Sequence, residues 1–89
     1  MIVHLIIKGN VQGVFFRATA RKVAEKNNLT GWIKNKSNGD VEAIVSGTDE
    51  NVRTFIEWCW NGPDKAQVED IVINEKLGMA FKSFEVKRD

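Results

Sequence analysis

The sequence is poor in the residues that hold metals or form crosslinks. Its 89 residues include one cysteine, one histidine and one proline, and no tyrosine. A lone Cys59 excludes a disulfide within the chain, and His4 adds no Cys/His cluster at metal-ligand spacing. No apolar run approaches the roughly 20 residues that a membrane helix needs. We therefore expect no metal, no cofactor and no membrane span.

An excess of charge of one sign is also missing. Thirteen basic and twelve acidic residues give a net charge of +1, so nothing indicates a nucleic-acid partner. The N-terminus lacks the basic region, apolar stretch and cleavage site of a signal peptide. The prediction is a soluble cytoplasmic protein that binds no nucleic acid.

The length and composition fit one compact domain over residues 1–89. Hydrophobic residues make up 43% of the chain and charged residues 28%, which favours a globular fold over disorder. No segment resembles a coiled coil or an obvious interface helix, so we expect a monomer.

Hydrophobic periodicity predicts alternating strands and helices. Apolar residues recur at helical spacing from Phe16 and again after a capping Thr48 or Asp49. The dipeptide Asn38-Gly39 predicts a hairpin turn, because both residues tolerate positive φ. Strands are expected at 2–8, 30–36, 40–46, 66–74 and 84–87.

This order predicts an α+β fold of the ferredoxin-like βαββαβ type. Such a fold is an antiparallel sheet with two helices on one face, here with a short extra C-terminal strand. Because this fold carries RNA binders, metal carriers, regulatory domains and enzymes, it does not decide the function. Cys59 is expected in the core, and Trp58 and Trp60 are expected to cover the sheet, with a partner-binding surface as the alternative for the two tryptophans. His4 is expected to be structural or exposed.

The glycine-bracketed loop before the first helix is the candidate anion site. Its backbone N–H groups and the helix N-terminus behind them can cradle a phosphate. Arg17 lies in the first helical turn, where the macrodipole disfavours a cation unless an anion is bound. The alternative, a plain turn whose Arg17 points into water, stays open on spacing alone. The amides concerned are those of Val11, Gln12, Gly13, Val14, Phe15 and Phe16.

Two motifs in this chain resemble those of the acylphosphatase family. The signature G-x-V-Q-G-V-x-F-R is matched at every fixed position by residues 9–17, GNVQGVFFR. The pattern G-W-x-x-N-x-x-x-G-x-V is matched by residues 31–41, GWIKNKSNGDV. The resemblance spans essentially the whole chain. One departure is Asp64, which stands where the family often has a second proline and concerns only the local loop.

The resemblance implies a reaction and a site. It implies a metal-independent, cofactor-free enzyme that hydrolyses acyl phosphates, with inorganic phosphate as product and inhibitor. It also implies that Arg17 binds the phosphoryl group together with the loop amides, and that Asn35 orients the attacking water. By itself Asn35 would be an ordinary strand-end residue.

Binding modules are the competing class. An RNA-recognition domain would show aromatic residues in its central strands, and residues 40–46 contain none. A metal carrier of this fold would need a Cys-x-x-Cys pair. A non-catalytic phosphate or acyl-phosphate sensor would keep the loop, but Asn35 favours the enzyme.

Overall fold

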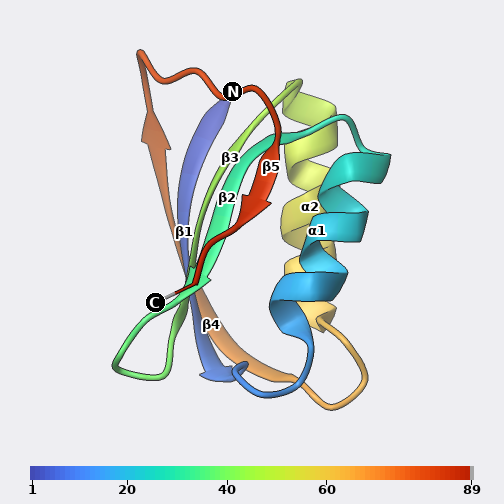
Figure 1. Ribbon diagram of the computed structural model, residues 1–89, viewed down its shortest axis with the longest axis vertical. Coiled ribbons are helices and arrows are strands. Elements are labelled where there is room, and N and C mark those ends of the chain that lie inside the picture. Colours follow the sequence, from blue (N-terminus) through green and yellow to red (C-terminus); the bar gives the residue numbers. More distant parts are fainter. Residues whose placement is uncertain (89) are drawn as a thin grey trace.

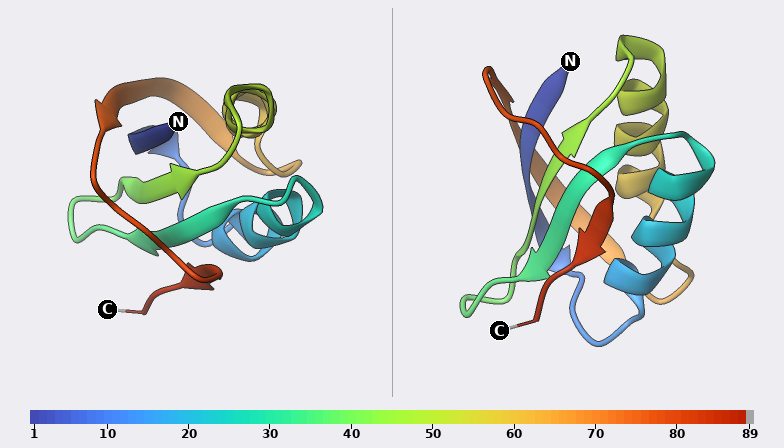
Figure 2. Two further views of the ribbon diagram at one scale, coloured as in Figure 1. Left: turned by 90° about the horizontal axis from the view of Figure 1, so that it is seen from above. Right: turned by 45° about the horizontal axis from the view of Figure 1, so that its top comes forward.

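The computed structural model describes residues 1–88 as one sheet with two helices on the same face (Figure 1, Figure 2). The predicted order of elements is confirmed, and strand boundaries differ from the expected ones by at most two residues. In chain order the elements are β1 (Ile2–Asn10), α1 (Phe16–Lys26), β2 (Thr30–Asn35), β3 (Val41–Ser46), α2 (Asp49–Asn61), β4 (Gln67–Lys76) and β5 (Phe84–Val86).

The strands lie in the order β4-β1-β3-β2-β5. The four long strands form the predicted antiparallel sheet. The short β5 pairs in parallel with β2, so the complete sheet is mixed. Figure 1 shows the reason: β4 ends at the end of the sheet where β2 begins, so a strand that starts there runs in the direction of β2.

The core lies between the sheet and the helices, and the predicted apolar stripes face it. Cys59 is fully buried, and burial raises the pKa of its thiol. Phe16 and Phe55 both pack against Trp58, with ring centroids 5.3 and 6.2 Å away. The buried stripes on strands and helices are Val3, Leu5 and Ile7; Val41, Ala43 and Val45; Phe16, Ala20 and Ala24; and Val52, Phe55 and Cys59.

The expectation that both helix tryptophans cover the sheet is wrong for Trp60, whose side chain is 46% exposed. Successive helix residues are rotated by about 100°, so Trp58 and Trp60 lie about 200° apart. They cannot both face the sheet.

The face of the sheet away from the helices carries a small charged cluster. His4 Nε2 lies 2.6 Å from Glu42 Oε2, and Lys34 Nζ lies 3.6 Å from Glu42 Oε1. Burial raises the pKa of Glu42, but the His4 hydrogen bond and the charges of His4, Lys34 and Lys36 outweigh it, so the net shift is downward. His4 therefore has a structural place in this cluster, as expected.

Two connections meet at one end of the molecule. The β1–α1 loop and the β2–β3 hairpin both lie at the lower end in Figure 1.

Thr48 caps α2, since its hydroxyl accepts a hydrogen bond from the Asn51 amide at 3.2 Å. No helix among residues 1–88 is long and apolar enough to cross a membrane.

Candidate active site

The β1–α1 loop is fixed in the core at both ends. Val11 and Phe16 are 1% and 2% exposed. Between them, Gly13 has φ 73° and Phe15 has φ 62°. A Cβ on Gly13 would meet no atom within 4 Å, so glycine is needed there for its backbone angle. Phe15 takes the left-handed conformation without that freedom, as residues at functional sites often do.

The amides of this loop are free to bind a ligand. Within residues 1–88, no backbone or side-chain acceptor pairs with the amides of residues 11 to 15. Phe15 is the N-cap of α1 and makes no side-chain cap, and the first turn holds no acidic residue. The first-turn amides of α1 therefore lack a side-chain acceptor among the described residues. No acidic side chain of that turn offsets the partial positive charge at the helix N-terminus.

A pocket of about 290 Å³ opens between this loop, β2 and the chain after β5. It contains both residues predicted to act on the substrate, Arg17 and Asn35. Two arginines line it, and none of the residues 1–88 that line it carries a carboxylate. Gln12 and Val14 belong to the predicted loop but do not line the pocket. The lining residues are Val11, Gly13, Phe15, Phe16, Arg17, Ala18, Asn35, Val86 and Arg88.

The Arg17 side chain is hydrogen-bonded to the segment that follows β5. Its Nη1 donates to the Lys87 carbonyl oxygen at 3.1 Å. The Lys87 amide in turn donates to the Ile33 carbonyl of β2 at 2.8 Å. Arg17 therefore does not point freely into water, which was the alternative that spacing left open.

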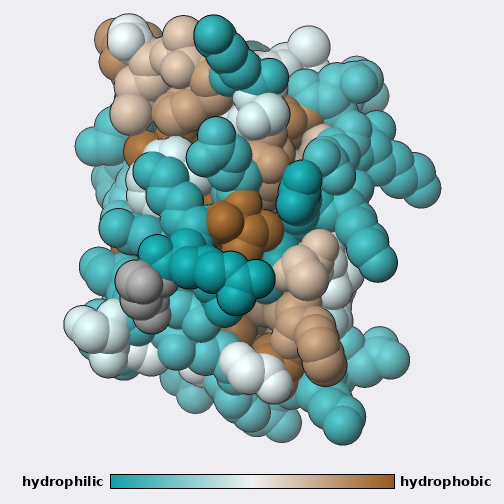
Figure 3. All heavy atoms as spheres, viewed as in Figure 1, coloured by the Kyte–Doolittle hydropathy of each residue, from teal (hydrophilic) through white to brown (hydrophobic). Residues whose placement is uncertain are grey.

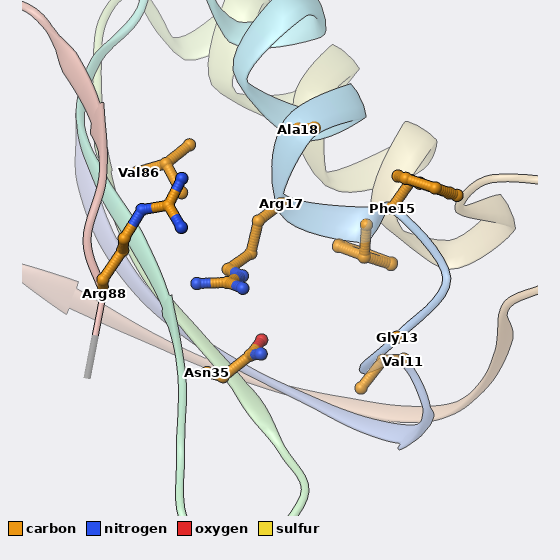
Figure 4. Close-up of a pocket in the computed structure, with 9 residues that line it drawn as sticks. Val11, Gly13, Phe15, Arg17, Ala18, Asn35, Val86 and Arg88 are labelled. Carbon is orange, nitrogen blue, oxygen red and sulfur yellow. The ribbon is translucent and has the colours of Figure 1, made fainter.

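Asn35 is the last residue of β2, opposite Val41 of β3. Its side chain points toward the guanidinium of Arg17 (Figure 4). In the part of the chain that the structure describes, no residue hydrogen-bonds to this side-chain amide. The amide is thus available to a ligand or a water molecule.

The hairpin beyond Asn35 differs from the expected tight turn. Only Gly39 takes a positive φ, 97°. Asn38 instead accepts a hydrogen bond from the Asp40 amide through its side chain at 3.0 Å. The Lys36 amide donates to the Asp40 carbonyl at 2.8 Å and closes the loop. Asn38 therefore stabilises the turn through a side-chain hydrogen bond, and not by adopting a left-handed backbone conformation.

Sequence reasoning missed three residues of the pocket: Ala18, Val86 and Arg88. Figure 4 shows Val86 and Arg88 on the side opposite the loop, with the Arg88 guanidinium directed toward Arg17. Ala18 follows Arg17 in the first helical turn and was not singled out. No local signal marks the other two, because their position depends on the pairing of β5 with β2.

The surface around the pocket is mostly polar. Figure 3 shows polar side chains over much of this face, with apolar surface at the upper left and in smaller areas near the end of β5 and the start of α1. Among residues 1–88, no group of three or more His, Cys, Asp or Glu side chains is placed to hold a metal ion. The arrangement of free amides and two arginines suits an anion.

Comparison with known proteins supports the resemblance that the motifs suggest. The acylphosphatase family model matches residues 3–86. This chain belongs to the acylphosphatase family. An acylphosphatase of Coxiella burnetii is 41% identical over 85 residues, which cover 96% of this chain and 90% of that relative.

Solved acylphosphatase structures have the same fold. One from Coxiella burnetii superposes with a TM-score of 0.93 at 41% identity and covers 97% of this chain and 90% of its own. One from Bacillus subtilis superposes with a TM-score of 0.94 at 32% identity, over 98% and 99% of the two chains. The chain therefore matches these acylphosphatases over nearly their whole length.

Proposed function

We propose that this acylphosphatase-family protein hydrolyses acyl phosphates by direct, in-line attack of water on phosphorus, without a metal. The amides of residues 11 to 16 and the Arg17 guanidinium hold the phosphoryl group. Asn35 orients the water. The products are a carboxylate and inorganic phosphate.

The phosphoryl cradle is supported by the donors that surround the pocket. The loop supplies amides that have no partner among residues 1–88, and Arg17 and Arg88 supply positive charge on a wall whose described residues include no carboxylate. In the transition state of phosphoryl transfer the negative charge is spread over the three equatorial oxygens, so fixed donors aimed at those oxygens lower the barrier. A planar guanidinium adds contacts to two oxygens at once.

The placement of Asn35 supports its proposed role in orienting water. Its side-chain amide faces the same pocket as Arg17 and has no hydrogen-bond partner among the described residues (Figure 4). A water molecule held in line with the breaking bond has already lost its freedom of position and orientation, so the entropic part of the activation barrier is smaller. Attack on phosphorus breaks the bond to the acyl oxygen, and the group that leaves is a carboxylate, so little acid catalysis is needed. In this proposal an oxygen of the substrate phosphate takes the proton of the water.

The pairing of free loop amides with Arg17 and Asn35 in one pocket is the observation that carries this function. The test is turnover of benzoyl phosphate or acetyl phosphate in EDTA. We expect full activity, competitive inhibition by inorganic phosphate, and poor turnover of phosphate monoesters, whose alkoxide needs acid or metal assistance. Activity lost in EDTA and restored by a divalent ion would contradict the metal-free mechanism.

A non-catalytic sensor is the second candidate, and the free loop amides suit it equally. It would bind inorganic phosphate in a calorimetric titration but would not turn over either substrate. The cytoplasmic location and monomeric state stay predictions of the sequence. Size-exclusion chromatography with light scattering tests the monomer.

A further inference from the structure

The side chain of Gln12 bridges two segments that are distant in the sequence. Its Nε2 donates to the Lys36 carbonyl at 2.7 Å and to the Asp40 carbonyl at 2.8 Å. These two carbonyls lie on the two sides of the β2–β3 hairpin. The bridge therefore joins the β1–α1 loop to the hairpin directly beyond Asn35.

The two partners of this bridge differ in how firmly they are held. The loop is fixed in the core by Val11 and Phe16, which are almost fully buried. The hairpin tip, residues 37–39, is exposed. The described hydrogen bonds and ion pairs that join residues 36–40 to the rest of the chain are the Gln12 bridge and an ion pair from Lys8 Nζ to Asp40 Oδ2 at 3.1 Å. Loss of the bridge should therefore move the hairpin and leave the loop in place.

We propose that Gln12 is a positioning residue, whose side chain sets the place of Asn35 relative to the phosphate loop. This inference rests on the proposed function. Gln12 does not line the pocket, so its side chain acts through the hairpin and not on the substrate. Both N–H bonds of its amide are used, one on each hairpin carbonyl, and this fixes the lateral position of the end of β2.

The key variant is Gln12→Met, which keeps the length of the side chain and the backbone amide but removes both donors. Gln12→Glu is a second variant of nearly the same shape, with acceptors in place of donors. Asn27→Ala serves as the control, because it removes one side-chain bond to a backbone carbonyl, Nδ2 to Val23 O at 2.8 Å, at the far end of α1. Turnover and phosphate affinity are measured on each protein.

We expect Gln12→Met to lower kcat about tenfold to a hundredfold, since displacements near 1 Å have effects of that size. The phosphate dissociation constant should change by less than about twofold, because the loop keeps its anchors. Asn27→Ala should change neither quantity by more than about twofold. A parallel loss of phosphate affinity in Gln12→Met would mean that the bridge shapes the cradle, and would overturn the proposal.

A double-mutant cycle gives the decisive result. If Gln12 acts through Asn35, then adding Gln12→Met to Asn35→Ala should lower kcat by less than about threefold further. If the two losses multiply, Gln12 acts independently of Asn35 and the inference is wrong. The cycle is repeated with Gln12→Glu, so a folding defect of one variant does not decide it.

A structural readout separates this inference from the proposed function. In NMR spectra, Gln12→Met should shift the Asn35 side-chain signals and the backbone signals of residues 36–40, and leave those of residues 13–16 in place. Wild-type protein that fails to turn over acyl phosphates would refute the function, while these shifts would still test the bridge. Unmoved Asn35 signals would refute the positioning role of Gln12 and leave the proposed function untouched.

Discussion

Replacing Asn35 by alanine separates water orientation from phosphate binding. The side chain hydrogen-bonds to no other described residue and lies at the end of a strand. Its removal therefore leaves no buried polar partner unsatisfied. The free energy of unfolding should change by less than about 0.5 kcal/mol, as is usual away from core and network positions. The variant is a clean kinetic probe.

The expected loss in rate follows from the role that we propose for Asn35. Removing one fixed donor from such a site costs about 10² to 10³ in kcat, or roughly 3–4 kcal/mol of barrier. Phosphate is held by the loop amides and Arg17, which the substitution does not touch. Its binding free energy should shift by no more than about 0.5 kcal/mol.

Two measurements on Asn35→Ala test this expectation. The first is kcat with benzoyl phosphate, and the second is the phosphate dissociation constant by calorimetry. Asn74→Ala, an exposed asparagine of β4 outside the pocket, is the matched control and should behave as wild type. A circular dichroism melt confirms the fold. If rate and affinity fall together, Asn35 belongs to the cradle; if neither falls, another group holds the water.

Two further predictions concern charged side chains. Arg17→Lys should keep less than about a tenth of wild-type kcat/KM, because an ammonium cannot make the two-pronged phosphate contact; nearly full activity would show that only diffuse charge matters. Glu42→Gln should destabilise the protein by roughly 1.5 kcal/mol at pH 7 in urea unfolding, because it loses a charge-assisted bond to His4. Against the effect of burial, the hydrogen bond from His4 and the nearby positive charges hold the pKa of Glu42 in the folded protein below its usual range, so the wild type loses this stabilisation as the pH falls through that folded pKa. The two proteins should converge there, and a constant difference down to strong acid would contradict the assignment.

Local spacing was enough to predict the elements of this fold. Phe16, Ala20 and Ala24 are buried because they recur at the helical period, and Val41, Ala43 and Val45 because they alternate. These patterns depend on neighbours within one element. The glycine-bracketed loop was located in the same way, from residues adjacent in the chain.

The parts that sequence reasoning missed depend on long-range pairing. Arg88 reaches the pocket because three residues of β5 pair in parallel with β2. The sequence favours Gln12 as a hydrogen bonder that shapes the loop over a catalytic role, but it does not indicate the partners, which lie 24 and 28 residues away in the chain. Phe15 is an aromatic residue with φ 62°, and nothing in its chemistry announces a left-handed conformation. Such features become visible only when distant segments are brought together.

The proposed site has few polar side chains, and hydrogen bonds connect each of their positions to the rigid sheet, helix or core. Arg17 is tied to the Lys87 carbonyl, and the Lys87 amide is tied to Ile33, two residues before Asn35 on the same strand. Asn35 is tied through its hairpin to Gln12, and the loop of Gln12 is anchored in the core. The bonds run from loop to hairpin, along β2 and back to α1. Because phosphoryl transfer depends mainly on placement, such a closed set of contacts can replace the additional acid, base or metal groups that other hydrolytic sites use.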